Sequence, residues 1–164
     1  MNWWGYLHLA VNHFPIISTI IGMLILLAGL IFKNEGIKLS GLGTMVFAAI
    51  MAIPAILTGD SAAEAVKGLP DVLSSLVEKH EDIAYVGLWS ILPMGIIAGL
   101  AIYSLLKKEK MYKSLVITAF VLSVLVSGIM IYVGRTGGKI RHSEFRNLSA
   151  PATKQAVEAD EEHD

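Results

Sequence analysis

Four histidines stand at or near the ends of the long apolar stretches of this chain. His8 and His13 lie in the first stretch, and His80 comes just before the third. His142 follows the fourth stretch by eight residues. Imidazole binds haem iron, copper, zinc or nickel, and a polar ring at membrane depth usually has a partner inside the protein. These four residues are therefore the candidate ligands, whereas His163 lies in an acidic tail and is assigned no role.

The distribution of charge predicts the elements that position these histidines. Four stretches of 21 residues or more contain no Asp, Glu, Lys or Arg. About 20 helical residues span a hydrocarbon core, and only a helix satisfies its own backbone groups in lipid. The sequence therefore predicts an all-α integral membrane four-helix bundle, with spans over residues 1–32, 39–59, 83–106 and 114–134.

An even number of spans places both termini, the 60–82 connection and the histidines at one end of the bundle. The opposite end carries two short loops, residues 33–38 and 107–113, with six Lys and two Glu between them. Short loops rich in Lys favour the cytoplasmic side. We therefore expect a bacterial inner-membrane protein whose N- and C-termini and histidines face the periplasm.

The connection between the second and third spans is predicted to carry a short amphipathic helix on the membrane surface. Its apolar residues recur at helical spacing within LPDVLSSLVEKH, and Pro70 suits a first helical turn. After the fourth span, residues 147–164 are polar and acidic. We therefore divide the chain into a transmembrane domain, residues 1–146, and a C-terminal tail, residues 147–164.

Composition excludes several classes of site. The chain has no cysteine, so it forms no disulfide, thiolate metal site or covalently attached c-type haem. A net charge of −1 argues against a nucleic-acid partner. No internal repeat is apparent in the sequence. These limits leave membrane lipid as one expected contact and imidazole as the main source of metal ligands.

Haem b fits these limits because it needs axial ligands and an apolar slot, but no cysteine. The strongest candidates for axial ligands are His13 and His80, followed by His8 and His142, and the four together would allow one or two haems. Arg135 and Arg141 are candidates for the haem propionates, although both also suit the role of interfacial anchors. Asp60 is the candidate acceptor that would orient an imidazole. Ala84 and Gly87, below His80, would let a flat macrocycle approach the helix.

A bare copper, zinc or non-haem iron ion is the competing interpretation. Asp60, Glu64, Glu81 and Asp82 could add carboxylate ligands to the histidines. However, His8 and His13 are five residues apart, which places them about 140° apart around a helix. That spacing suits two different neighbours better than one shared ion.

Four sequence elements together resemble a family of bacterial membrane proteins. They are His8-x4-His13-Phe14-Pro15-Ile16, Thr58-Gly59-Asp60, His80 before a span, and Thr136-Gly137-Gly138-x3-His142. This pattern resembles the four-helix predicted membrane proteins grouped as domain of unknown function 2231. The chain has Leu9 where proline is common, and a shortened glycine segment before His142. The resemblance implies a four-helix membrane protein with these histidines at motif positions, and it implies no reaction.

From these residues we predict a membrane b-type cytochrome with one or two bis-His haems near the outer face. It would transfer electrons as a subunit rather than act as a stand-alone enzyme. Its partners would be a periplasmic redox protein, a quinol or a larger respiratory-type complex. Two alternatives remain open at this point: a membrane protein that binds non-haem metal, and a structural subunit whose histidines are merely interfacial.

Overall fold

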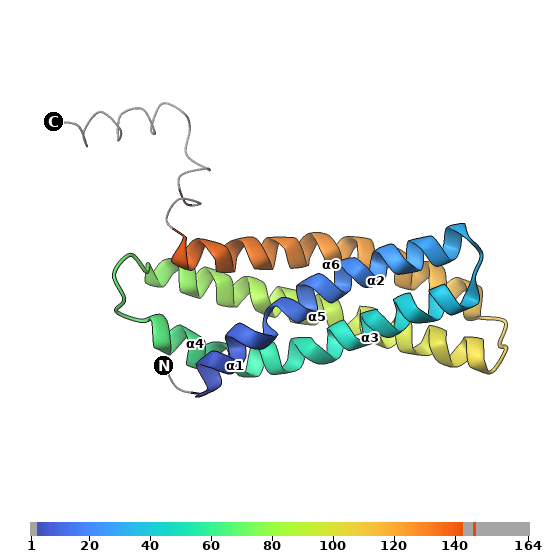
Figure 1. Cartoon of the computed structure of the whole chain (residues 1–164), viewed down its shortest axis with the longest axis horizontal. Coiled ribbons are helices and arrows are strands. Elements are labelled where there is room, and N and C mark those ends of the chain that lie inside the picture. Colours follow the sequence, from blue (N-terminus) through green and yellow to red (C-terminus); the bar gives the residue numbers. More distant parts are fainter. Residues whose placement is uncertain (1–2, 143–145, 147–164) are drawn as a thin grey trace, which may run out of the picture.

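The computed structural model describes residues 3–142 and Arg146. All regular secondary structure of these residues is helical, and the helices form an elongated bundle (Figure 1). The helices are α1 (Trp3–Val11), α2 (His13–Ile31), α3 (Glu35–Leu57), α4 (Gly59–Val66), α5 (Ser74–Leu106) and α6 (Tyr112–Arg141).

Four helical segments of the described chain are long and apolar enough to cross a membrane. The first combines α1 and α2, and the others are α3, α5 and α6. Large apolar side chains cover the outside of these segments, including Ile21, Phe47, Ile96 and Leu125. An outward apolar surface on a helical bundle is what lipid requires. The predicted all-α membrane bundle is therefore confirmed.

The first span is bent where α1 meets α2, which the charge pattern did not predict. Pro15 has no N–H to donate to the carbonyl of Val11, so the helical ladder is interrupted there. Asn12, between the two helices, keeps helical backbone angles, and its N–H bonds the carbonyl of His8 at 2.9 Å. The bend directs α1 away from the axis of α2 and toward α4 (Figure 1).

The spans pack as two helical hairpins laid side by side. The hairpin of α2 and α3 faces the hairpin of α5 and α6, and the main contacts between them join α3 to α5 and α2 to α6. The core between them contains Leu26, Leu42, Met45, Ile91, Met94, Ala98 and Met130. Each span therefore has two neighbouring spans.

Small residues set the distances between the spans. A methyl group on Gly41 of α3 would lie 2.6 Å from the backbone nitrogen of Leu26 in α2. Gly95 of α5 lies against the side chain of Ala49 in α3 in the same way. Close approach through small residues increases the dispersion contact that holds helices together in lipid.

The connection between the second and third spans differs from its prediction in one respect. Its short helix is α4, which begins at Gly59, directly after α3. The amphipathic segment expected as a separate surface helix instead forms the first turns of α5, from Ser74 onward. Pro70 lies in the turn before α5 rather than in its first helical turn. Polar residues outside the lipid can continue the same hydrogen-bonded helix. The expected surface helix and the third span therefore form one continuous helix, α5.

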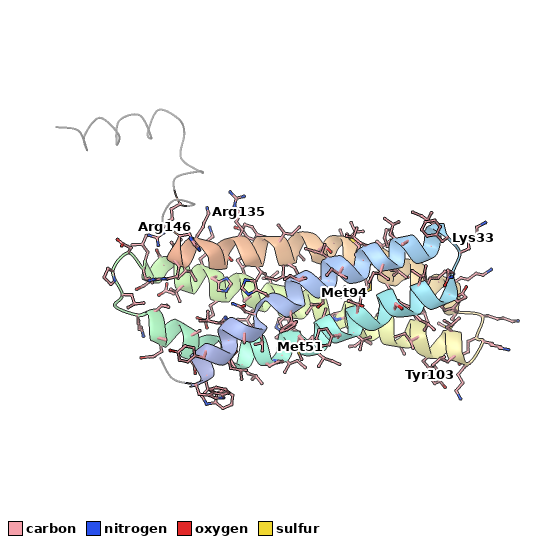
Figure 2. The ribbon with its side chains drawn as sticks, in the orientation of Figure 1. Lys33, Met51, Met94, Tyr103, Arg135 and Arg146 are labelled. Atoms are coloured by element: carbon pink, nitrogen blue, oxygen red, sulfur yellow. The ribbon has the colours of Figure 1, made fainter. Side chains whose placement is uncertain are left out.

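Both ends of the described chain lie at the end of the bundle that carries α4, opposite the two short loops (Figure 1). Figure 2 places Arg135 and Arg146 at this end, and Lys33 and Tyr103 at the opposite one. We call the end that carries α4 the histidine end, because His8, His13, His80 and His142 all belong to it.

Candidate functional site

His8 is held against the end of the second span. Its Nδ1 lies 3.0 Å from the carbonyl oxygen of Ala55 and 3.2 Å from Oγ1 of Thr58. The Thr58 hydroxyl donates its own proton to the carbonyl of Pro54 at 2.7 Å. Thr58 is only 1% exposed, so this contact is sheltered inside the protein.

His80 is held in the same manner against the end of the fourth span. Its Nδ1 lies 3.0 Å from Oγ1 of Thr136, and that hydroxyl donates to the carbonyl of Val133 at 2.8 Å. A methyl group on Gly137 would lie 3.0 Å from Cε1 of His80. The ring therefore rests directly on the backbone of α6, at a position where any residue larger than glycine would require the ring to shift.

These contacts fix which nitrogen of each ring carries a proton. A carbonyl oxygen only accepts hydrogen bonds, so Nδ1 of His8 must be the donor to Ala55. The Thr136 proton is already engaged with Val133, so Nδ1 of His80 must donate to Thr136. Among the described residues, Nε2 of neither ring has a hydrogen-bond partner. Both neutral rings thus keep the Nε2 lone pair for a ligand, as in metal-binding histidines whose other nitrogen is held by a protein acceptor.

The two contacts reveal a repeated unit that the sequence alone did not suggest. In each hairpin, a histidine near the start of the first span meets a Thr-Gly pair at the end of the second span. His8 meets Thr58 and Gly59, and His80 meets Thr136 and Gly137. We call each set a His/Thr-Gly unit. Both Thr-Gly dipeptides were part of the family pattern in the sequence, and the missed signal was that the dipeptide recurs after both even-numbered spans.

The two units lie near one another at the histidine end. His8 and His80 are close enough that a positive charge on one ring would disfavour a positive charge on the other, and the same holds for His13 and His8. Because α1 packs mainly against α4, with smaller contacts to α3 and α2, it makes at most marginal contact with α5 and α6. The bundle is therefore less tightly closed between α1 and the second hairpin than it is deeper in the membrane.

Asn12 adds a polar group to the same face of the first span. It lies one turn beyond His8, and residues four apart share a helical face. Its Oδ1 is buried and has no hydrogen-bond partner among the described residues. A buried carbonyl oxygen normally finds a donor. The region beside His8 thus has hydrogen-bonding capacity that the surrounding protein does not use.

The other two candidate histidines are placed differently. His13 begins α2 and is exposed, so it does not face the bundle interior as we expected. His142 is also exposed, at the end of α6, where its N–H bonds the carbonyl of Gly138 at 3.2 Å. The structure therefore holds His8 and His80 against neighbouring spans, whereas His13, which the sequence ranked beside His80, is exposed. His163 lies outside the described residues.

The candidate charged residues are all at the histidine end, but they do not touch the imidazoles. Arg135 and Arg141 are exposed on α6. Asp60 is exposed in the first turn of α4. The orienting role that we assigned to Asp60 is carried out instead by Thr58 and Ala55 for one ring, and by Thr136 for the other.

Gly87 does not provide the approach to a macrocycle that the sequence suggested. It is buried, and a methyl group there would lie 2.7 Å from Cε of Met130 and 3.0 Å from Cγ2 of Val133. Its small size serves the packing of α5 on α6. Space for a flat ligand near His80 must therefore come from the side that faces α1.

The donor set distinguishes between kinds of metal centre. Among residues 3–142 and Arg146, no group of three or more His, Cys, Asp or Glu side chains is placed to hold a metal ion. A bare zinc ion usually takes at least three protein ligands, whereas haem supplies four nitrogens itself and needs one or two from the protein. Two imidazoles with free Nε2 atoms are therefore enough ligands for haem and fewer than a bare zinc ion usually takes.

The fold and this site define a four-span helical membrane protein with paired histidines at one end. The family model described as "Predicted membrane protein (DUF2231)" matches residues 6–144, and the chain belongs to that family. Neither the curated proteins nor the solved structures include a significant match to it. The family match confirms the predicted resemblance and covers both His/Thr-Gly units.

Proposed function

We propose that the protein is a membrane b-type cytochrome that holds haem through His8 and His80 and transfers electrons. The observation that carries this proposal is that the two imidazole rings make the same kind of hydrogen bond. Each donates from Nδ1 to an acceptor on a neighbouring span and keeps Nε2 free, as axial imidazole ligands do. One ring comes from each hairpin, so a ligand between them would be bound from both sides.

The residues around the rings have distinct tasks in this proposal. Thr58 and Thr136 hold the imidazole planes, and Gly137 leaves space for the ring of His80. Haem bound there would supply reversible one-electron chemistry, with a potential tuned by axial ligands, hydrogen bonds and burial. Arg135 and Arg141 remain candidates for the propionates, with their role as interfacial anchors as the alternative.

The side of the membrane on which the histidine end lies determines which partners can reach it. The short loops at the other end are rich in Lys, which favours a cytoplasmic location for them and a periplasmic one for the histidines. We infer insertion in a bacterial inner membrane, with electron exchange at its outer face. The partner would then be a periplasmic redox protein, a quinol or a larger respiratory-type complex.

The test is a visible absorption spectrum of the detergent-purified protein, produced with ample haem and recorded before and after reduction by dithionite. We expect the sharp bands of a low-spin bis-imidazole haem. His8→Ala and His80→Ala should each abolish that spectrum if one haem is bound, and should each remove half of the haem if there are two. His13→Ala and His142→Ala should leave it unchanged if one haem is bound, and should remove half of the haem if there are two. Asp60→Asn, an exposed change at the same end, serves as the control.

Three results would contradict the proposal. Colourless protein that contains stoichiometric zinc or copper would favour the non-haem metal protein. Colourless, metal-free protein would leave the structural subunit as the remaining interpretation. An unchanged haem spectrum in both His8→Ala and His80→Ala would remove this pair as the ligands, even if haem is present.

A further inference from the structure

We infer that the groove between α5 and α6 at the histidine end binds the phosphate group of an anionic phospholipid. The groove is lined by Leu76 and Lys79 of α5 and by Tyr132, Arg135, Thr136 and Lys139 of α6. Its volume is about 320 Å³. The groove shares Arg135 and Thr136 with the proposed haem site, but the lipid inference does not require that haem is bound.

The charge of the groove selects an anion. Its lining contains three basic side chains and no acidic one. Neither Lys79 nor Arg135 has an acidic partner among the described residues, where the one ion pair joins Lys38 to Glu35 at the opposite end. Arg135 projects outward from α6 (Figure 2). Basic pockets between membrane helices are a recognised way to bind anionic lipid headgroups.

Four acidic residues of the same region line a different cavity rather than the groove. A second cavity, between α4 and α5, is lined by Asp60, Glu64, Glu78 and Glu81, with Lys67 as its one basic residue. In the first turns of α5, Lys79 thus lies on the α6 side and Glu78 and Glu81 lie on the α4 side. Asp82, one turn after Lys79, is exposed and does not line the groove, so the lining itself is positive although the whole connection is acidic.

The groove continues into an apolar surface that suits acyl chains. On α6, Leu125 and Val121 lie seven and eleven residues before Tyr132, so they occupy the same helical face. They are 62% and 52% exposed. On α5, the exposed Val86 lies seven residues after Lys79. On the same face of α6, Gly128 is exposed, and no described atom lies within 4 Å of the position where its side chain would begin. A free phosphate ion would make no use of this surface, whereas a phospholipid would.

The position along the membrane also fits a headgroup. Arg135 is the first charged residue after the charge-free run 114–134, so it lies where the hydrocarbon region ends. Tyr132, one turn deeper, is an aromatic residue of the kind enriched at that level. The phosphate of a phospholipid and the basic groove would therefore be at the same depth.

The experiment measures how tightly the detergent-purified full-length protein retains added lipid, by native mass spectrometry. Phosphatidylglycerol is compared with phosphatidylcholine of identical acyl chains. We expect the protein to prefer phosphatidylglycerol, and the double variant Lys79→Gln/Arg135→Gln to bind it roughly ten- to thirtyfold more weakly, since each basic group near an anionic headgroup contributes to binding.

The matched control is Lys107→Gln/Lys110→Gln, which removes the same charge from exposed positions at the other end of the bundle. It should retain the wild-type affinity. Lys79→Arg, which keeps the charge, should bind nearly as well as the wild type and shows that the site tolerates substitution. Equal affinity for the two lipids, or equal losses in the two double variants, would overturn the inference. Competition by millimolar inorganic phosphate would assign the groove to a free anion instead of a lipid.

Discussion

At the scale of single residues, a threonine under each imidazole decides which ring nitrogen can meet a ligand. The tautomer is set by hydrogen bonds to atoms that can only accept, or whose own proton is already engaged. The same contact limits the rotation of the ring. A glycine follows each threonine, and at Gly137 it allows the ring of His80 to lie close to the helix backbone, whereas a methyl group on Gly59 would be in ordinary contact with His8, at 3.9 Å.

Gly137→Ala tests that close contact. The added methyl group would lie 3.0 Å from the His80 ring and should displace it, with a cost of about 1–3 kcal/mol in unfolding free energy. Under the proposed function, the haem content should also fall. Thermal unfolding in detergent and the haem-to-protein ratio are the measurements.

Gly138→Ala is the control, because no described atom lies within 4 Å of the position of its methyl group. Both substitutions gain the same helix propensity, about 1 kcal/mol, so that contribution cancels in the comparison. Equal stability and equal haem content in the two variants would mean that the ring of His80 does not rest on Gly137.

The roles of Thr58 and Thr136 could not be predicted from one sequence. Each hydroxyl meets a histidine far away in the chain, with 50 residues separating His8 from Thr58 and 56 separating His80 from Thr136. Such contacts depend on helix rotation and register, which apolar composition does not specify. The histidines themselves could be selected, because polar rings beside charge-free runs stand out from their surroundings.

At the scale of elements, the bend at Pro15 directs α1 toward α4 and brings His8 to Thr58. The four spans were predictable because lipid excludes charge from about 20 consecutive residues. The bend was not, because it depends on how the chain uses the missing N–H of a proline. The start of α5 was also missed, since exposed charged residues before a span can extend its helix or end it.

Pro15→Ala should restore the hydrogen bond to Val11 and straighten the first span. We expect α1 to move away from α4 and His8 to lose its contact with Thr58. The chain has no cysteine, so spin labels can be attached at Tyr6→Cys and Glu64→Cys without a background. The distance between the labels should lengthen or broaden in the Pro15→Ala protein.

Pro93→Ala is the matched control, because it changes a proline inside α5, thirteen residues from His80. It should leave the distance between the labels unchanged. If Pro15→Ala also leaves that distance unchanged, the proline does not cause the bend.

At the scale of the whole molecule, the arrangement of the spans places both ends of the described chain and both His/Thr-Gly units at one end of the bundle. The proposed orientation can be tested with reporter fusions. Alkaline phosphatase is active only outside the cytoplasm, so it should be active when fused after Arg146. It should be inactive when inserted in the 107–113 loop. Green fluorescent protein should give the opposite pattern, and a reversed result for both reporters would place the histidines in the cytoplasm.

The two hairpins are arranged as the two copies of a twofold-symmetric dimer would be. In a twofold dimer, residues on the axis meet their own equivalents. Here the contacts of α3 with α5 and of α2 with α6 correspond to one another, as they would across such an axis. The single chain thus resembles a dimer whose two copies have been joined and have since diverged. A ligand between His8 and His80 would lie near that pseudo-axis and would receive the same donor atom, with the same orienting hydroxyl behind it, from both sides.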